Sequence, residues 1–122
     1  MDYDKEAVPM QVMHDDAMWQ TFHALGCGFS AYLIHPVNGT CVWVTGEGPN
    51  GPSNFYVERE VTQELESLGL VSSAPSDFTE DSSETYLLTD DGRQLYEQYR
   101  DMPSDQGEGL FLNVIHEMRR RH

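Results

Sequence analysis

An Asn-Gly dipeptide at residues 38–39 lies between two stretches that are rich in β-branched and aromatic residues. Both central residues of a type I′ turn need positive φ, which Asn and Gly tolerate, so this pattern is the strongest short-range signal of a β-hairpin. A two-residue loop at this point places Leu33 opposite Val44 and Ile34 opposite Trp43. Apolar residues then fall on both faces of the hairpin, and we expect both faces to be covered.

Apolar residues recur at helical spacing on either side of this hairpin and predict four helices. Residues 1–13 carry alternating acids and are expected to form a flexible arm. The loop 46–52 is expected to end the hairpin, and the polar loop 75–83 is expected to separate two short strands, 70–73 and 84–88. The first expected helix covers about 15–25, and the last covers 106–122. The second runs from Ser53 or Asn54 to Leu68, with Gly69 at the C′ position. The third is capped by Thr89 and runs to about Arg100.

The length of 122 residues fits one α+β domain, in which 14–55 form a helix and a β-hairpin and 106–122 form a C-terminal amphipathic helix. No apolar run approaches the roughly 18 residues that cross a bilayer. The N-terminus has neither the basic nor the apolar segment of a secretory signal. We therefore expect a cytoplasmic protein with no membrane partner, in which Cys27 and Cys41 are free thiols.

Acidic residues outnumber basic ones by 21 Asp and Glu to 7 Lys and Arg, which gives a formal net charge of −14. Nucleic-acid binding needs clustered Lys and Arg to neutralise phosphates, so the composition argues against it. The excess is uneven along the chain: residues 1–92 hold 16 acids and two cations, whereas residues 93–122 hold five of each. An acidic body therefore precedes a near-neutral segment that contains three successive arginines, Arg119–Arg121.

Residues 56–100 resemble the second half of a winged-helix domain of the MarR and PadR type. The similar pieces are Val61-Thr-Gln-Glu-Leu-Glu-Ser-Leu-Gly-Leu-Val71 and Tyr86-Leu-Leu-Thr-Asp-Asp-Gly-Arg-Gln-Leu-Tyr96. The resemblance implies a winged-helix-like core in which the first helix lies in the major groove, two strands form the wing and a C-terminal helix dimerises. The helix that should precede the groove-reading helix is missing, because a strand and the loop 46–52 stand in its place.

The charges of this segment oppose the function of that family. From 58 to 92 the sequence has ten acidic residues and one arginine, Arg59, a net charge of −9. DNA-binding elements place Lys and Arg where they meet phosphates, and these positions would repel phosphate instead. We therefore predict a partner-binding surface made of eight carboxylates: Glu58, Glu60, Glu64, Glu66, Asp77, Glu80, Asp81 and Glu84.

These features indicate a non-enzymatic protein-binding module whose acidic face occupies a basic, nucleic-acid-binding surface of another protein. In its profile the chain is similar to the small acidic DNA-mimic inhibitors of phages and mobile elements, including anti-CRISPR proteins. That resemblance implies inhibition of a host protein or complex. A surface that only keeps the protein soluble, or that is adapted to high salt, would carry the same kind of charge.

The alternative function is a dimeric winged-helix transcription regulator that binds DNA through Arg59 and Arg119–Arg121. The apolar stripe of the last helix fits either the core of one chain or the seam of a dimer. The residues of this stripe are Leu110, Phe111, Val114, Ile115 and Met118.

Other chemistry has no clear signature, so we predict no catalytic residue, no metal ligand and no cofactor. The G-x-G-x-x-G pattern at 46–51 follows an antiparallel strand and contains a proline without an N–H, which is typical of an ordinary turn. His23, Cys27, His35 and Cys41 lack the spacing of a zinc site. The sequence has no nucleophile elbow and no metalloprotease motif, and capping explains the paired acids at helix starts.

Overall fold

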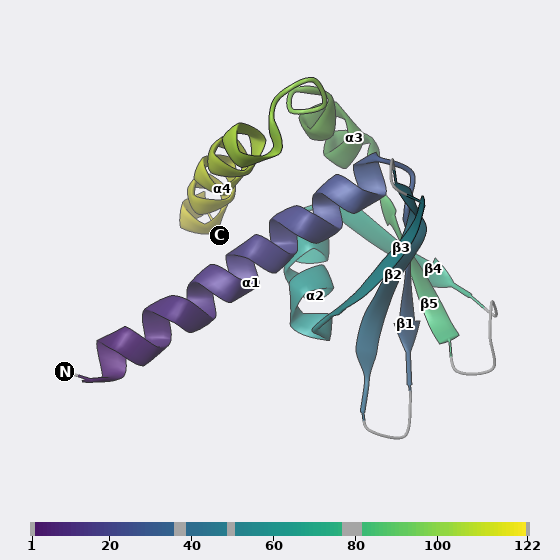
Figure 1. The fold of residues 1–122 in the computed structure, drawn as a ribbon, viewed down its shortest axis with the longest axis horizontal. Coiled ribbons are helices and arrows are strands. Elements are labelled where there is room, and N and C mark those ends of the chain that lie inside the picture. Colours follow the sequence, from purple (N-terminus) through teal and green to yellow (C-terminus); the bar gives the residue numbers. More distant parts are fainter. Residues whose placement is uncertain (1, 36–38, 49–50, 77–81, 122) are drawn as a thin grey trace.

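The computed structural model describes residues 2–35, 39–48, 51–76 and 82–121 (Figure 1). They form four helices and five strands, which confirms the predicted α+β class. In chain order the elements are α1 (Asp2–Gly26), β1 (Ser30–Ile34), β2 (Cys41–Gly48), β3 (Gly51–Val57), α2 (Arg59–Ser67), β4 (Val71–Pro75), β5 (Ser82–Leu88), α3 (Asp90–Glu97) and α4 (Ser104–Arg121). Within these ranges we find no helix long and apolar enough to cross a membrane.

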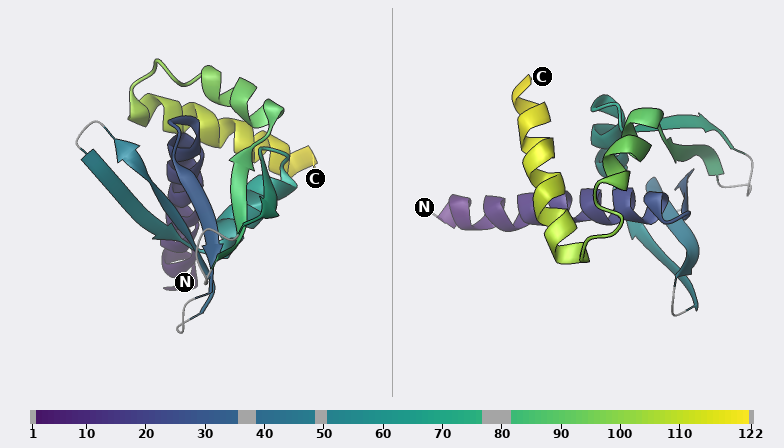
Figure 2. Two further views of the ribbon diagram at one scale, coloured as in Figure 1. Left: turned by 90° about the vertical axis from the view of Figure 1, so that its right-hand side faces the viewer. Right: turned by 90° about the horizontal axis from the view of Figure 1, so that it is seen from above.

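The strands form one antiparallel sheet in the order β3-β2-β1-β5-β4, and α1 and α2 lie against one of its faces (Figure 1, Figure 2). Side chains on that face, such as Leu33 and Val42, are buried. On the opposite face Tyr32 and Trp43 are half-buried and Tyr56 is 62% exposed. No described element covers this second face, so the expectation of a hairpin covered on both sides is wrong; antiparallel sheets commonly leave one face to solvent.

The β1–β2 hairpin forms as predicted, but in another register. Leu33 and Ile34 each face a residue two positions earlier than predicted, Val42 and Cys41. A shift of two residues keeps every side chain on its own face of the sheet, so the core side of the hairpin is unchanged. The connection is longer than the expected two-residue loop, and the predicted turn at 38–39 lies partly outside the described residues.

Residues 46–48 and 51–52 are part of the sheet rather than of the loop that the glycines and prolines predict, and residues 49–50 lie outside the described residues. Residues 46–48 and 51–52 form the facing ends of β2 and β3, where Glu47 pairs with Pro52 and Gly48 pairs with Gly51. β3 is an edge strand, so the missing N–H of Pro52 need not interrupt the interior of the sheet. The β2–β3 hairpin therefore fills the place where the winged-helix resemblance expects a helix.

α2 begins later than predicted and ends where predicted. The expected caps Ser53 and Asn54 lie in β3, and the helix instead follows Glu58, which has an extended backbone and makes no side-chain cap bond. Gly69 has a φ of 80°, and its N–H bonds to a carbonyl of the last turn, as a C′ residue does. The β3 strand has thus displaced the start of the helix without changing its end.

The predicted start is correct for α3 and wrong for α1. α3 begins as predicted, because the Thr89 hydroxyl oxygen accepts a hydrogen bond from the N–H of Gly92 at 3.0 Å. α1 begins at Asp2, within the segment 1–13 that we expected to form an arm. The expectation of an arm is therefore wrong for the backbone of residues 2–13.

Aromatic rings from α1 and α4 form the core between the helices. Phe111 stacks on Phe22 with 4.7 Å between ring centroids, and the Trp19 ring centroid lies 5.4 Å from that of Phe111. Phe111 and Ile115 are fully buried, whereas Leu110 is exposed. The centre of the α4 stripe therefore packs within one chain.

Candidate functional site

The two sides of α2 have different surroundings. Val61 and Leu65 are buried against the core. Glu60 and Glu66 are exposed on the helix, and Glu58 is exposed directly before it. In the described part of the chain none of these three carboxylates forms an ion pair. The outer side of α2 therefore presents free negative charge.

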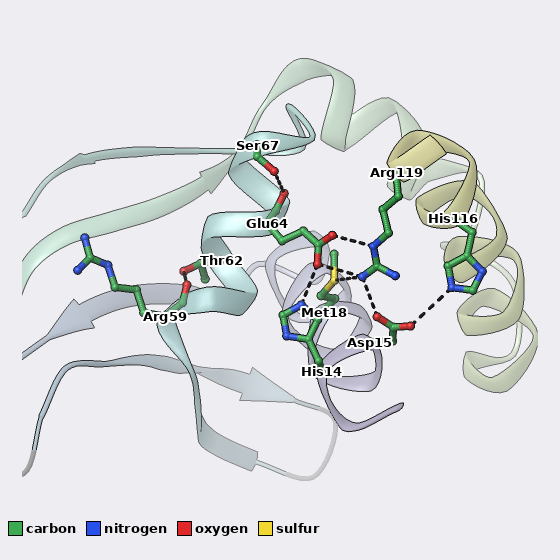
Figure 3. Close-up of polar contacts among 9 residues, drawn as sticks. All are labelled: His14, Asp15, Met18, Arg59, Thr62, Glu64, Ser67, His116 and Arg119. Carbon is green, nitrogen blue, oxygen red and sulfur yellow. Dashed lines mark hydrogen bonds and ion pairs between the residues drawn. The ribbon is translucent and has the colours of Figure 1, made fainter. Parts of the chain in front are cut away.

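Glu64 differs from the other glutamates of α2, because it faces α1 and α4 and binds Arg119 there (Figure 3). Arg119 Nε donates to Glu64 Oε2 at 2.7 Å, and Arg119 Nη2 donates to Glu64 Oε1 at 2.9 Å. Two such bonds fix the guanidinium relative to the carboxylate. Each side chain is 25% exposed, so salt screens the pair less than it screens a surface pair. Glu64 thus belongs to the internal structure.

Asp15 and two histidines complete this group, which we call the Arg119 cluster. Arg119 Nη2 also donates to Asp15 Oδ1 at 2.8 Å, and His14 Nε2 lies 2.8 Å from Glu64 Oε1 (Figure 3). His116 Nε2 lies 3.6 Å from Asp15 Oδ2. One guanidinium therefore joins α1, α2 and α4.

The electrostatics of the cluster keep the pair of Glu64 and Arg119 charged at neutral pH. The hydrogen bonds from Arg119 lower the pKa of Glu64, and the hydrogen bond from His14 adds to this effect. Burial acts in the opposite direction but does not outweigh them. The hydrogen bond to Glu64 in turn raises the pKa of Arg119. The cluster is therefore a charged joint between helices. Its two carboxylates bind Arg119 and are not free to bind a partner.

Glu84 of β5 is related to α2 by Tyr86, which lies two positions further along the same strand. The hydroxyl of Tyr86 shares a hydrogen bond with Thr62 and feels the charges of Glu84, Glu66 and Arg59. Burial is the main cause that raises the pKa of Tyr86, and the two carboxylates raise it further. Carboxylates of α2 and β5 thus both act on the Tyr86 hydroxyl.

A hollow of about 460 Å³ lies where β3 passes into α2. Its lining includes Tyr56, the carboxylates Glu58 and Glu60, and one cation, Arg59. Tyrosine is enriched at protein interfaces, where its ring supplies contact area and its hydroxyl a hydrogen bond. We use the name α2 surface for the exposed ring of Tyr56, for Glu58 and Glu60 beside the same hollow, and for Glu66 and Glu84, whose charges act on Tyr86.

The remaining predicted site residues fall into two groups. Asp77, Glu80 and Asp81 lie outside the described residues. Val114 and Met118 of the α4 stripe are half-buried. The structure therefore places five of the eight predicted carboxylates, four on the α2 surface and one in the Arg119 cluster.

Cys27, His23 and Tyr96 form a small hydrogen-bonded group at the end of α1. Cys27 Sγ lies 3.2 Å from Tyr96 Oη and 3.8 Å from His23 Nε2. Burial lowers the pKa of His23 and raises that of Tyr96, so neither supplies a charge beside the thiol at neutral pH. Nor do three His, Cys, Asp or Glu side chains gather as metal ligands anywhere in the described ranges.

Sequence reasoning missed the Arg119 cluster. Arg119 and Asp15 are 104 positions apart, and Asp15 stands at the start of the helix predicted for 15–25, whereas in the structure it lies inside α1. The available signal was local: Arg119 lies four residues after Ile115, hence on the buried side of α4. A cation on a buried helix face predicts an internal carboxylate partner.

Comparison with known proteins gives no relative from which function could be transferred. No protein-family model, curated protein or solved structure matches the chain. Inference about function therefore starts from the α2 surface and the other features of this molecule.

Proposed function

We propose that this chain is a non-enzymatic protein-binding module whose α2 surface occupies a basic, nucleic-acid-binding surface of a partner. The contrast within α2 carries the proposal: Glu64 is neutralised by Arg119, whereas Glu60 and Glu66 face solvent without a cation. Carboxylates on a packed helix present negative charge in a fixed arrangement. Such a surface attracts a basic partner over distance and speeds its association.

The α2 surface also has features of a contact surface besides charge. The exposed ring of Tyr56 lies beside Glu58 and Glu60 around the hollow between β3 and α2. An aromatic anchor surrounded by charged groups is a common arrangement at protein interfaces. We propose that arginines and lysines of the partner bind these carboxylates in place of DNA phosphates, in the manner of phage and mobile-element inhibitors.

We further propose that β1, α2, β4 and β5 form a winged-helix-like core, to which α1, the β2–β3 hairpin and α4 are added. The strand order β1-β5-β4 and the position of α2 directly before β4 support this interpretation. In such a core α2 takes the place of the groove-reading helix. Its glutamates then stand where a DNA-binding domain carries cations.

The test is capture of partners on the immobilised full chain from a lysate of its native host, followed by elution with a short DNA duplex. We expect a DNA-binding protein to be retained and then released by the duplex. The Glu60→Lys/Glu66→Lys variant should retain little of it, because the surface charge of α2 changes sign.

The matched control is Asp91→Lys/Glu97→Lys, which changes the net charge equally on exposed positions of α3. The control variant should retain the partner. Full retention by the α2 variant would contradict the proposal, and so would a captured partner that DNA does not release.

The alternative, DNA binding as a dimer, would use Arg59, Arg120 and Arg121, which are exposed. Arg119 is held by Glu64 and cannot contribute without breaking the Arg119 cluster. A gel shift with duplex DNA at low salt separates the two functions, since a DNA-binding chain must lose affinity steeply as salt rises. The proposed function predicts no shift at any salt concentration.

A further inference from the structure

A cavity of about 830 Å³ opens between α1, the β2–β3 hairpin and the start of α4. We call it the hairpin groove. Its volume falls within the range of roughly 300–1,000 Å³ that is typical of ligand sites. Its lining comes from four elements, for example Asp16 of α1, Glu47 of β2, Phe55 of β3 and Glu108 of α4, and it shares no residue with the α2 surface.

The charged groups that line the groove are acidic. Asp16, Glu47 and Glu108 contribute carboxylates, and no Lys or Arg is among the lining residues. His23 also lines it, but burial lowers the pKa of this histidine, so it is neutral at pH 7. The lining therefore disfavours anions and is complementary to a cation.

Asp16 and Glu108 meet across the seam between α1 and α4. Both carboxyl groups line the groove, and Gln20 Nε2 donates to Asp16 Oδ2 at 3.2 Å. Burial raises the pKa of Glu108, and the contact with Asp16 raises it further. The fold thus places two carboxyl groups on one wall of the groove, and a cation bound between them would favour their charged forms.

Aromatic rings form much of the remaining wall. Phe29 and Phe55 are half-buried, and Trp19 is nearly buried and stacks on His23 with 5.1 Å between ring centroids. A guanidinium is planar, stacks on aromatic faces and binds carboxylates through two parallel bonds. The ammonium of lysine is compact and more strongly hydrated, so this wall favours arginine.

We propose that the hairpin groove is a second binding site, which takes an arginine side chain of a protein or peptide between Asp16 and Glu108 and against the ring of Phe55. The site goes beyond the function proposed for the α2 surface, because it requires an arginine and no DNA-binding partner. Either site can therefore exist without the other.

The test is an NMR titration of the ¹⁵N-labelled full chain with a triarginine peptide that is acetylated and amidated at its ends. The reporters are the Trp19 indole N–H and the backbone amides of Gln20 and Glu108. We expect saturable shifts at these reporters in the millimolar range. The tricitrulline peptide, which has the same shape without the charge, should cause none, and trilysine should bind about threefold more weakly.

Variants then assign the binding to the groove. Asp16→Asn/Glu108→Gln should weaken triarginine binding about tenfold, because the peptide loses two charge-assisted contacts. The matched control Asp91→Asn/Glu97→Gln removes the same charge from α3 and should stay within about twofold of wild type. If the groove double variant does not fold, the single Glu108→Gln variant should weaken binding by about threefold.

Two results would overturn this inference: no shifts at the groove reporters, or equal weakening in the groove variant and the control. The second result would show attraction to net charge rather than a site. Glu60→Gln/Glu66→Gln should leave groove binding within about twofold of wild type, since its changes lie on the α2 surface. Failure of the groove and failure of the α2 surface are thereby distinguished.

Discussion

The Arg119 cluster and the α2 surface both include glutamates of the same nine-residue helix, yet the surroundings of these glutamates are opposite. In the cluster Glu64 is held between helices by a guanidinium that also binds Asp15. On the α2 surface Glu60 and Glu66 face solvent. The difference teaches that the position of the cation, rather than the number of carboxylates, decides whether a glutamate serves the fold or is free to bind.

The two regions also differ in what a substitution should do. Removing one partner of a mostly buried ion pair leaves an uncompensated charge and is strongly destabilising. Changing an exposed carboxylate without a partner has little effect on the free energy of unfolding. Measurements of stability and of binding should therefore separate the regions cleanly.

The largest effect on stability is expected for the core beside the cluster. Phe111→Ala should lower the free energy of unfolding by about 3–5 kcal/mol, because it leaves a cavity among the rings of Trp19 and Phe22. Urea unfolding followed by circular dichroism measures it. Leu110→Ala, on the exposed side of α4, should cost about 0.5 kcal/mol or less. Similar losses for the two variants would instead place the whole stripe in a dimer seam.

Replacement of the central cation is expected to be the next most damaging change. Arg119→Met should cost about 2–4 kcal/mol, because Glu64 and Asp15 then lose the guanidinium that binds them both. The same unfolding experiment applies. Arg120→Met removes an equal charge from a side chain that is 80% exposed, and it should stay within about 0.5 kcal/mol of wild type. Equal losses would mean that net charge, not the cluster, matters.

Acid should remove the contribution of Glu64, in the Arg119 cluster, to the free energy of unfolding. The pKa of Glu64 in the folded state lies below its unfolded value of about 4.3, so its stabilising effect is complete above that value. The contribution is lost as pH falls through the lower folded-state pKa, where the carboxylate takes up a proton. The difference in unfolding free energy between wild type and Glu64→Gln should therefore be largest near pH 7 and shrink below pH ~4. A constant difference from pH 7 to pH 3 would contradict the charged joint.

The α2 surface should show the smallest change in stability. Glu60→Lys/Glu66→Lys is expected to stay within about 0.5 kcal/mol of wild type, since neither carboxylate has a partner in the described chain. Thermal unfolding at matched salt tests this prediction. A larger loss would show that these glutamates serve the fold, and the comparison between the two regions would then fail.

Much of the fold follows from local signals. The Thr89 cap, the Gly69 end of α2 and the first hairpin are local features, and the structure has all three. The β2–β3 hairpin could not be predicted in this way. Its glycines and Pro52 have poor intrinsic strand preference, and pairing with the long β2 strand overrides that preference.

The candidate site also has one part that the sequence predicts and one part that it does not. The exposure of Glu58, Glu60 and Glu66 follows from charge in a helix whose buried side is apolar. The internal position of Glu64 does not, because it depends on Arg119, 55 positions further along the chain. Helical spacing shows which side chains share a face, but it does not show which distant element carries the neutralising group.

The joint between α1 and α4 has a consequence for synthesis on the ribosome. Trp19 and Phe22 emerge early, whereas Phe111 and Arg119, which cover and fasten that part of α1, are translated about a hundred codons later. At roughly 5–20 residues per second the nascent chain carries uncovered aromatic rings for several seconds. These rings are therefore covered only after α4 has been made and docks against α1.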